Sequence, residues 1–168
     1  MDTIRVVAGT GRGPTGTAAY DAALADCGVH NYNLVRVSSV VPPGATVERV
    51  ERAPDLGPVG GRLTVVQARA TVRGPGVAGA ALGWARTADG SGLFYEADEV
   101  GRPGGDPAAR AADRVRAGLA AGLDLRDWDA DEPTVVTAST AADGDERATA
   151  VVVGTYGRAD PILGPEKD

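Results

Sequence analysis

The sequence predicts an α+β protein, a layered αββα sandwich of mostly antiparallel strands with two main helices. Three observations favour this class. Short apolar runs and alternating segments typical of strands recur along the 168-residue chain. Only two segments, residues 17–27 and 106–123, combine helical spacing of apolar residues with a capping residue. Two helices suffice to cover the outer faces of two packed sheets, and we find no linker that would divide the chain.

The first expected elements are a buried strand, a glycine-rich segment and a helix. Ile4–Ala8 is a short apolar run that ends in glycine. Residues 9–16 lack both the Gly-Lys-Ser/Thr ending of a Walker loop and the glycine spacing of a dinucleotide fingerprint. A flexible turn or a substrate-side loop is therefore favoured there over a phosphate site. Thr17–Cys27 is the first helix, with a threonine cap at position 15 or 17 and a glycine stop after it.

A second strand runs from Asn33 to two adjacent serines, Ser38 and Ser39. Its valines and leucine suit a strand, whereas Pro42 and Pro43 cannot donate ladder hydrogen bonds and must end it. At such a strained corner, one serine hydroxyl could attack the neighbouring backbone carbonyl. The peptide bond itself is then a candidate substrate.

A turn-rich excursion of mixed charge, residues 44–61, follows the serine corner. Three further strands are expected beyond it. They cover Arg62–Arg73, Val77–Ala85 and Gly92–Val100, and glycine-containing turns separate them.

The last elements are a helix, a hairpin and a tail. Asp106–Leu123 is the clearest helix, because Asp106 can cap it and Pro107 occupies its first position. Thr134–Ala141 and Arg147–Tyr156 flank an Asp-Gly turn and are expected to pair as a hairpin. The proline- and charge-rich tail from residue 159 onward is expected to fray.

Composition and charge exclude several function classes. The net charge is −6, and Lys167 is the only lysine, a bias typical of proteins of salt-loving, GC-rich organisms in which acidity serves solubility. No basic stripe with interleaved aromatics is present, so no nucleic-acid partner is expected. No apolar run approaches the ~18–20 residues of a membrane span and no signal peptide is visible, so we expect a cytoplasmic protein without a membrane partner. One histidine and one cysteine, His30 and Cys27, offer no metal cluster, so no metal is expected.

The run from Asn33 to Pro43, Asn-Leu-Val-Arg-Val-Ser-Ser-Val-Val-Pro-Pro, resembles the processing site of the pyruvoyl-dependent arginine decarboxylases. The similarity extends upstream through residues 19–24 and the Cys-Gly helix end, and downstream through Gly92–Glu96 and the helix around residues 111–123. The resemblance thus covers most of the chain. It implies the pyruvoyl-dependent decarboxylase fold, as a single domain over residues 1–168.

This resemblance implies that the chain cleaves itself between Ser38 and Ser39, which yields a β chain of residues 1–38 and an α chain of residues 39–168. Residue Ser39 would become a covalent pyruvoyl group at the start of the α chain, the only cofactor. Its ketone would form a Schiff base with L-arginine and accept the electrons released with CO2, giving agmatine for polyamine biosynthesis. No pyridoxal phosphate is expected, and the single lysine near the C-terminus is a poor candidate to bind one.

The resemblance also assigns roles to four more residues. Glu96 is the expected proton donor, and its apolar neighbours Leu93–Tyr95 are expected to desolvate its carboxyl group and raise the pKa. Asn33 would assist processing through a hydrogen bond to the oxyanion. Asp21 would receive the substrate guanidinium in a bidentate pair. Leu24 would line the methylene stem, although a core leucine is an equally good interpretation.

Family members form trimers of αβ units with active sites between neighbouring subunits, so a homotrimer or a dimer of trimers is expected. Two alternatives stay open. The chain could be a pyruvoyl-dependent decarboxylase of another amino acid, which replacement of Asp21 by Asn would distinguish. It could also be a non-catalytic, uncleaved oligomeric binding protein, although the intact set of Asn33, Ser38, Ser39 and Glu96 argues against that reading.

Overall fold

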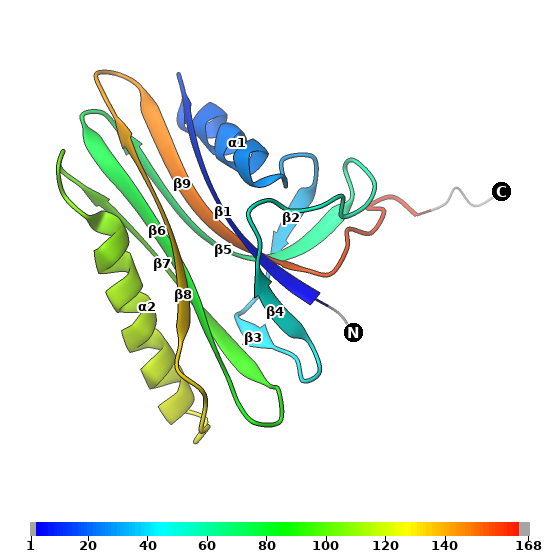
Figure 1. Ribbon diagram of the computed structural model, residues 1–168. Coiled ribbons are helices and arrows are strands. Elements are labelled where there is room, and N and C mark those ends of the chain that lie inside the picture. Colours follow the sequence, from blue (N-terminus) through cyan, green and yellow to red (C-terminus); the bar gives the residue numbers. More distant parts are fainter. Residues whose placement is uncertain (1–2, 165–168) are drawn as a thin grey trace.

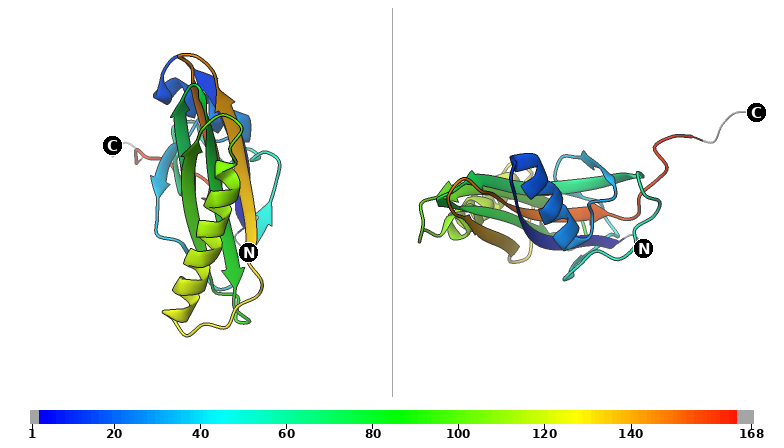
Figure 2. Two further views of the ribbon diagram at one scale, coloured as in Figure 1. Left: turned by 90° about the vertical axis from the view of Figure 1, so that its left-hand side faces the viewer. Right: turned by 90° about the horizontal axis from the view of Figure 1, so that it is seen from above.

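The computed structural model describes residues 3–164, which form two packed β-sheets with one helix on each outer face (Figure 1). Sheet A has the strand order β2-β5-β9-β1-β4, and sheet B has the order β3-β7-β6-β8. Helix α1 packs on β1 and β9 of sheet A, while α2 lies along the strands of sheet B (Figure 2). The predicted α+β class is confirmed, and the layers are compatible with an αββα sandwich.

The elements follow one another along the chain with these bounds: β1 Thr3–Gly13, α1 Gly16–Cys27, β2 Asn33–Arg36, β3 Val40–Val41, β4 Thr46–Arg49, β5 Arg62–Arg73, β6 Gly76–Arg86, β7 Gly92–Gly101, α2 Pro107–Asp124, β8 Thr134–Ala142 and β9 Arg147–Tyr156. Two strand pairs, β1–β4 and β2–β5, are parallel, and the other pairs are antiparallel. The mostly antiparallel character predicted from the sequence is thus confirmed.

Both helices begin at predicted caps. The Thr15 hydroxyl accepts a hydrogen bond from the Ala18 N–H at 3.1 Å, and the Asp106 carboxylate accepts one from the Ala109 N–H at 3.0 Å. Gly28 ends α1 in the left-handed conformation, with φ of 87°, which glycine adopts without a steric penalty. Neither helix of the described residues has the length and apolarity that a membrane crossing requires.

The glycine-rich segment is a strand, so the expectation of a flexible turn or loop there is wrong. Strand β1 continues to Gly13, and α1 lies directly across its glycines. A Cβ atom on Gly9 or Gly11 would lie 2.4 or 2.3 Å from backbone atoms of Ala23. The missing side chains therefore let the helix backbone approach the strand, and the segment serves packing rather than phosphate binding.

The expected hairpin of the last two strands is also wrong. Strand β8 pairs with β6 in sheet B, whereas β9 pairs with β1 and β5 in sheet A. The turn at Asp143 and Gly144 therefore carries the chain from one sheet to the other. Apolar residues on the facing sides of the two sheets form one core. Its members include Ile4, Val6, Val66, Leu82, Trp84, Phe94 and Val152.

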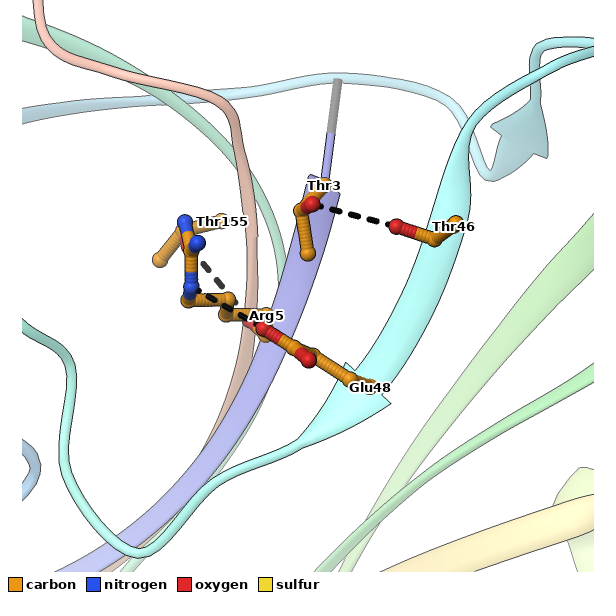
Figure 3. A network of polar contacts seen from close by, with 5 residues as sticks. All are labelled: Thr3, Arg5, Thr46, Glu48 and Thr155. Carbon is orange, nitrogen blue, oxygen red and sulfur yellow. Dashed lines mark hydrogen bonds and ion pairs between the residues drawn. The ribbon is translucent and has the colours of Figure 1, made fainter. Parts of the chain in front are cut away.

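The expected turn-rich excursion contains an edge strand, β4, which pairs in parallel with β1. Side chains reinforce this pairing (Figure 3). The Thr46 hydroxyl donates to the Thr3 hydroxyl at 3.1 Å, and Arg5 Nε lies 3.1 Å from Glu48 Oε1. On the other side of β1, the Thr155 hydroxyl donates to the Arg5 carbonyl at 3.4 Å.

The tail is ordered further than expected. Ala159 is 6% exposed, and its N–H donates to the Leu56 carbonyl at 2.8 Å. Asp160 pairs with Arg62 through two backbone hydrogen bonds. Fraying at residue 159 is therefore wrong, because the chain is still paired there. Lys167 lies outside the described residues.

Candidate active site

The serine pair lies in the connection between the two sheets. Strand β2 of sheet A ends at Arg36, three residues before the predicted end, and β3 of sheet B begins at Val40. Because β3 is only two residues long, it leaves the edge of β7 uncovered, and a cavity of about 420 Å³ opens beside it. The cavity is lined by Ser38, Ser39, Val40, Leu93, Phe94, Tyr95, Glu96 and Arg126.

The backbone at the serine pair forms a hydrogen-bonded turn. The Val40 N–H donates to the Ser38 carbonyl at 3.0 Å, which makes a γ-turn centred on Ser39. Among the described residues Asp127 is the one non-glycine residue with positive φ, so the serine turn does not enter the left-handed region. The carbonyl that the Ser39 hydroxyl would attack thus already has an N–H donor, which can stabilise an oxyanion.

The Ser39 hydroxyl and the Glu96 carboxylate are in direct contact. The Ser39 Oγ donates to Glu96 Oε2 at 3.0 Å, although 57 positions separate the two residues in the sequence. A carboxylate in this position can take the proton of an attacking hydroxyl. Leu93 and Phe94 are buried in the two cores and leave Glu96 exposed. Within one chain they therefore do not supply the desolvation that the sequence led us to expect.

Sequence reasoning missed two residues at this site, Tyr156 and Arg126. The Tyr156 hydroxyl donates to the Val40 carbonyl at 3.1 Å, and its ring packs edge-on against Phe94. Burial, and secondly the negative charge of Glu96, raises the pKa of Tyr156 to about 12, so the phenol stays a donor. Arg126 reaches the cavity from the end of α2. No local pattern could identify either residue, because both contacts bridge distant parts of the chain.

Three sequence-predicted residues lie away from this cavity in the described chain. Asn33 stands at the start of β2, where its amide donates to the Gly60 carbonyl at 2.6 Å. Asp21 is an exposed residue of α1. This helix covers the outer side of sheet A (Figure 1). Leu24 is 7% exposed and packs in the core between α1 and sheet A. The processing role of Asn33 and the substrate-binding roles of Asp21 and Leu24 stay predictions.

A layered α+β fold that places a serine hydroxyl, an acceptor carboxylate and an N–H donor around one peptide bond has the arrangement that a self-processing protein requires. A family model described as pyruvoyl-dependent arginine decarboxylase (PvlArgDC) matches residues 3–161. The chain belongs to the pyruvoyl-dependent arginine decarboxylase family, as the resemblance at the serine pair indicated.

Individual relatives agree with this assignment. The chain is 54% identical over 163 residues to a pyruvoyl-dependent arginine decarboxylase of Halobacterium salinarum, with 97% of this chain and 99% of the relative covered. A relative of the same name from Thermococcus kodakarensis is 35% identical over 150 residues, covering 87% and 90%. Another from Methanococcus vannielii is 31% identical over 134 residues, covering 78% and 76%.

Proposed function

We propose that the chain cleaves itself between Ser38 and Ser39 and then converts L-arginine to agmatine and CO2. The observation that carries this proposal is the hydrogen bond of 3.0 Å from the Ser39 hydroxyl to the Glu96 carboxylate. Ser39 is the central residue of the γ-turn. Membership of the family and the name shared by its relatives support arginine as the substrate. The single domain of residues 1–168 would then consist of a β chain, residues 1–38, and an α chain, residues 39–168, in the fold of the pyruvoyl-dependent decarboxylases.

The processing chemistry follows from groups already in contact. As the Ser39 Oγ bonds to the Ser38 carbonyl carbon, its proton passes to Glu96 and from there to the departing nitrogen of residue 39. The amide thereby becomes an ester. Loss of the α-hydrogen of residue 39 expels the Ser38 carboxylate and leaves dehydroalanine, which takes up water, releases ammonia and becomes a pyruvoyl group.

The surroundings of residue 39 fit a pyruvoyl group at the new chain end. The Phe94 N–H donates to the carbonyl of residue 39 at 2.7 Å, and Tyr156 holds the next carbonyl, so neither contact uses the atoms lost in processing. When formed, the group supplies an electron sink for loss of CO2. Glu96 lies within hydrogen-bond reach of the side chain of residue 39, which supports its proposed role as the donor of a proton to the substrate α-carbon.

A second copy of the chain is proposed to complete the site, in a homotrimer of αβ units or a dimer of trimers. Val35, Val37 and Val40 flank the serine pair and are 41%, 39% and 44% exposed, which leaves an apolar strip beside the cavity. A partner covering this strip would shield Glu96 from water and bring its own Asp21 to the cavity. The Asp21 carboxylate would accept the two parallel N–H groups of the substrate guanidinium, a pairing that selects arginine.

Intact-mass spectrometry of the purified protein tests the processing step, and a single uncut chain would overturn it. Agmatine release from arginine, compared with release of the corresponding amines from other amino acids, tests the substrate. Asp21→Asn should lower turnover of arginine and spare a substrate without a guanidinium group, and light scattering gives the number of copies. Preference for another amino acid would replace arginine in the proposal, whereas an uncleaved and inactive oligomer would favour the non-catalytic binding protein.

A further inference from the structure

Among the described residues that line the cavity beside Ser39 and Glu96, Arg126 is the one cation. It comes from the C-terminal end of α2, which lies at the same end of the molecule as β3, toward the bottom of Figure 1. The Arg126 side chain is exposed, and together with the Glu96 carboxylate it gives the cavity one group of each charge. An anionic group of a ligand can pair with the guanidinium.

The Arg126 guanidinium is held in place by the C-terminal end of α2, which finishes two residues before it. Its Nη1 donates to the Gly122 carbonyl at 2.9 Å, and its Cζ lies 5.7 Å from the centre of the Trp128 ring. Between Arg126 and Trp128, Asp127 has a φ of 53° and turns the chain sharply. The backbone N–H of Trp128 then donates to the Leu123 carbonyl at 3.1 Å. The arginine is therefore anchored on one side before any ligand arrives.

The other side of the guanidinium makes no polar contact with the described residues. Within residues 3–164, the Nε and Nη2 groups of Arg126 donate to no other residue, and no carboxylate forms an ion pair with it. Two parallel N–H groups on a planar fork match the two oxygens of a carboxylate. The helix contact and a carboxylate contact can therefore coexist on one side chain.

We propose that Arg126 binds the α-carboxylate of the substrate. This inference rests on the proposed decarboxylation of arginine, whose amino group must reach residue 39 and whose carboxylate is its only anionic group. Glu96 repels that carboxylate and Arg126 attracts it, while Arg126 repels the substrate guanidinium and directs it away from this end of the cavity. The contact is made with the group that departs as CO2, so it distinguishes arginine from agmatine and disappears as the product forms.

The test compares two ligands that differ in the carboxylate. The processed wild-type enzyme, Arg126→Gln and Arg126→Lys are assayed for kcat and KM with arginine and for competitive inhibition by agmatine. Arg126→Gln should raise the KM for arginine about 10- to 100-fold, as expected for a lost charged hydrogen bond, and change the inhibition constant of agmatine less than about twofold. The KM of Arg126→Lys for arginine should lie between those of the wild type and Arg126→Gln, because lysine keeps the charge but cannot form the bidentate pair. Arg116→Gln, on the exposed side of the same helix, is the matched control and should behave as wild type.

Each outcome decides the matter. If Arg126→Gln raises the KM for arginine and the inhibition constant of agmatine by the same factor, the residue only supports the helix end and the inference is wrong. An unchanged KM in both Arg126 variants would overturn it as well, with the proposed function intact. A wild-type enzyme that releases no agmatine would overturn both. If Arg126→Gln does not fold, as judged by its thermal melt, the lysine variant with the same pair of ligands still decides between a selective and a general effect.

Discussion

Strands β3 and β4 are short edge strands separated only by residues 42–45, yet they are held in different ways. Strand β4 pairs in parallel with β1 and is fastened by side chains, through Thr46 on Thr3 and Glu48 on Arg5 (Figure 3). Strand β3 is held almost entirely through backbone carbonyls and N–H groups, with one phenol added. Side chains therefore fasten β4, whereas backbone groups fasten β3 and leave the Ser39 hydroxyl to its contact with Glu96.

This difference has a reason in the proposed processing step. Cleavage between residues 38 and 39 makes β3 the start of a new chain, so contacts that do not depend on the broken bond must hold it. The Val37 N–H donates to the Val65 carbonyl at 3.0 Å on one side of the bond. On the other side the Phe94 N–H donates to the Ser39 carbonyl at 2.7 Å. Both new ends are therefore fastened to different sheets before the bond breaks.

The largest effect is expected from Ser39→Ala, which removes the attacking hydroxyl at the β3 edge. Without this oxygen no ester can form, so cleavage should be absent. Ser38→Ala is the matched control, because residue 38 contributes only its backbone carbonyl to the reaction and the variant should still cleave. Intact-mass spectrometry of both variants after prolonged incubation gives the answer, and two fragments from Ser39→Ala would contradict the proposed chemistry.

Glu96→Gln should slow cleavage by about a hundredfold, within the range of general acid–base catalysis. The amide still accepts a hydrogen bond from Ser39 but cannot take its proton. Asp98→Asn offers the comparison, since this residue is also exposed and lies two positions further along the same strand. The half-time of conversion from uncut to cut chain, followed on denaturing gels, should change in the first variant only. Equal half-times would remove Glu96 from the processing step.

The sequence predicts the residues at the β3 edge better than it predicts how the elements pack. The serine pair and Glu96 could be identified because a long motif carries them and the resemblance connects them. The packing of Gly9 and Gly11 against α1 could not, because a glycine-rich run looks the same whether a loop or a helix lies over it. The sequence also did not predict that the chain crosses from one sheet to the other between β5 and β6 and between β8 and β9. A short turn between two strands normally indicates a hairpin, and a turn that connects two packed sheets has the same local sequence.

Tyr156→Phe should have an intermediate effect, because it removes one hydrogen bond to the Val40 carbonyl while keeping the ring against Phe94. We expect a loss of about 1 kcal/mol in the free energy of unfolding and cleavage slower by up to about tenfold. Urea denaturation and the gel assay measure the two quantities. Tyr95→Phe is the control at the same cavity, and its cleavage rate should equal that of the wild type. A fully stable and normally cleaving Tyr156→Phe would show that the phenol contributes nothing to holding β3.

The pH dependence of Tyr156 gives a separate test. Folding raises its pKa to about 12 from an ordinary value of about 10, because burial and the charge of Glu96 oppose ionisation. The stabilisation from this phenol is complete below about pH 10 and is lost as the pH rises through about 12. Tyrosinate absorbance should show one of the chain's four tyrosines ionising late in the folded protein. Glu96→Gln should move that late step to lower pH, and an unmoved step would mean that burial alone sets the pKa.

The smallest effect is expected at the β4 edge, from Glu48→Gln. The partners Arg5 and Glu48 are 28% and 50% exposed, so their ion pair contributes no more than about 1 kcal/mol to the free energy of unfolding. Cleavage should be unaffected, because the side-chain contacts of β4 do not reach the serine turn. Urea denaturation at low and high salt distinguishes the contribution of the β4 ion pair from that of the hydrogen bond at β3. Salt screens the exposed pair, so the small difference between wild type and Glu48→Gln should vanish in concentrated salt. The effect of Tyr156→Phe should persist there, since a hydrogen bond from a neutral phenol to a backbone carbonyl is screened far less than a pair of charges.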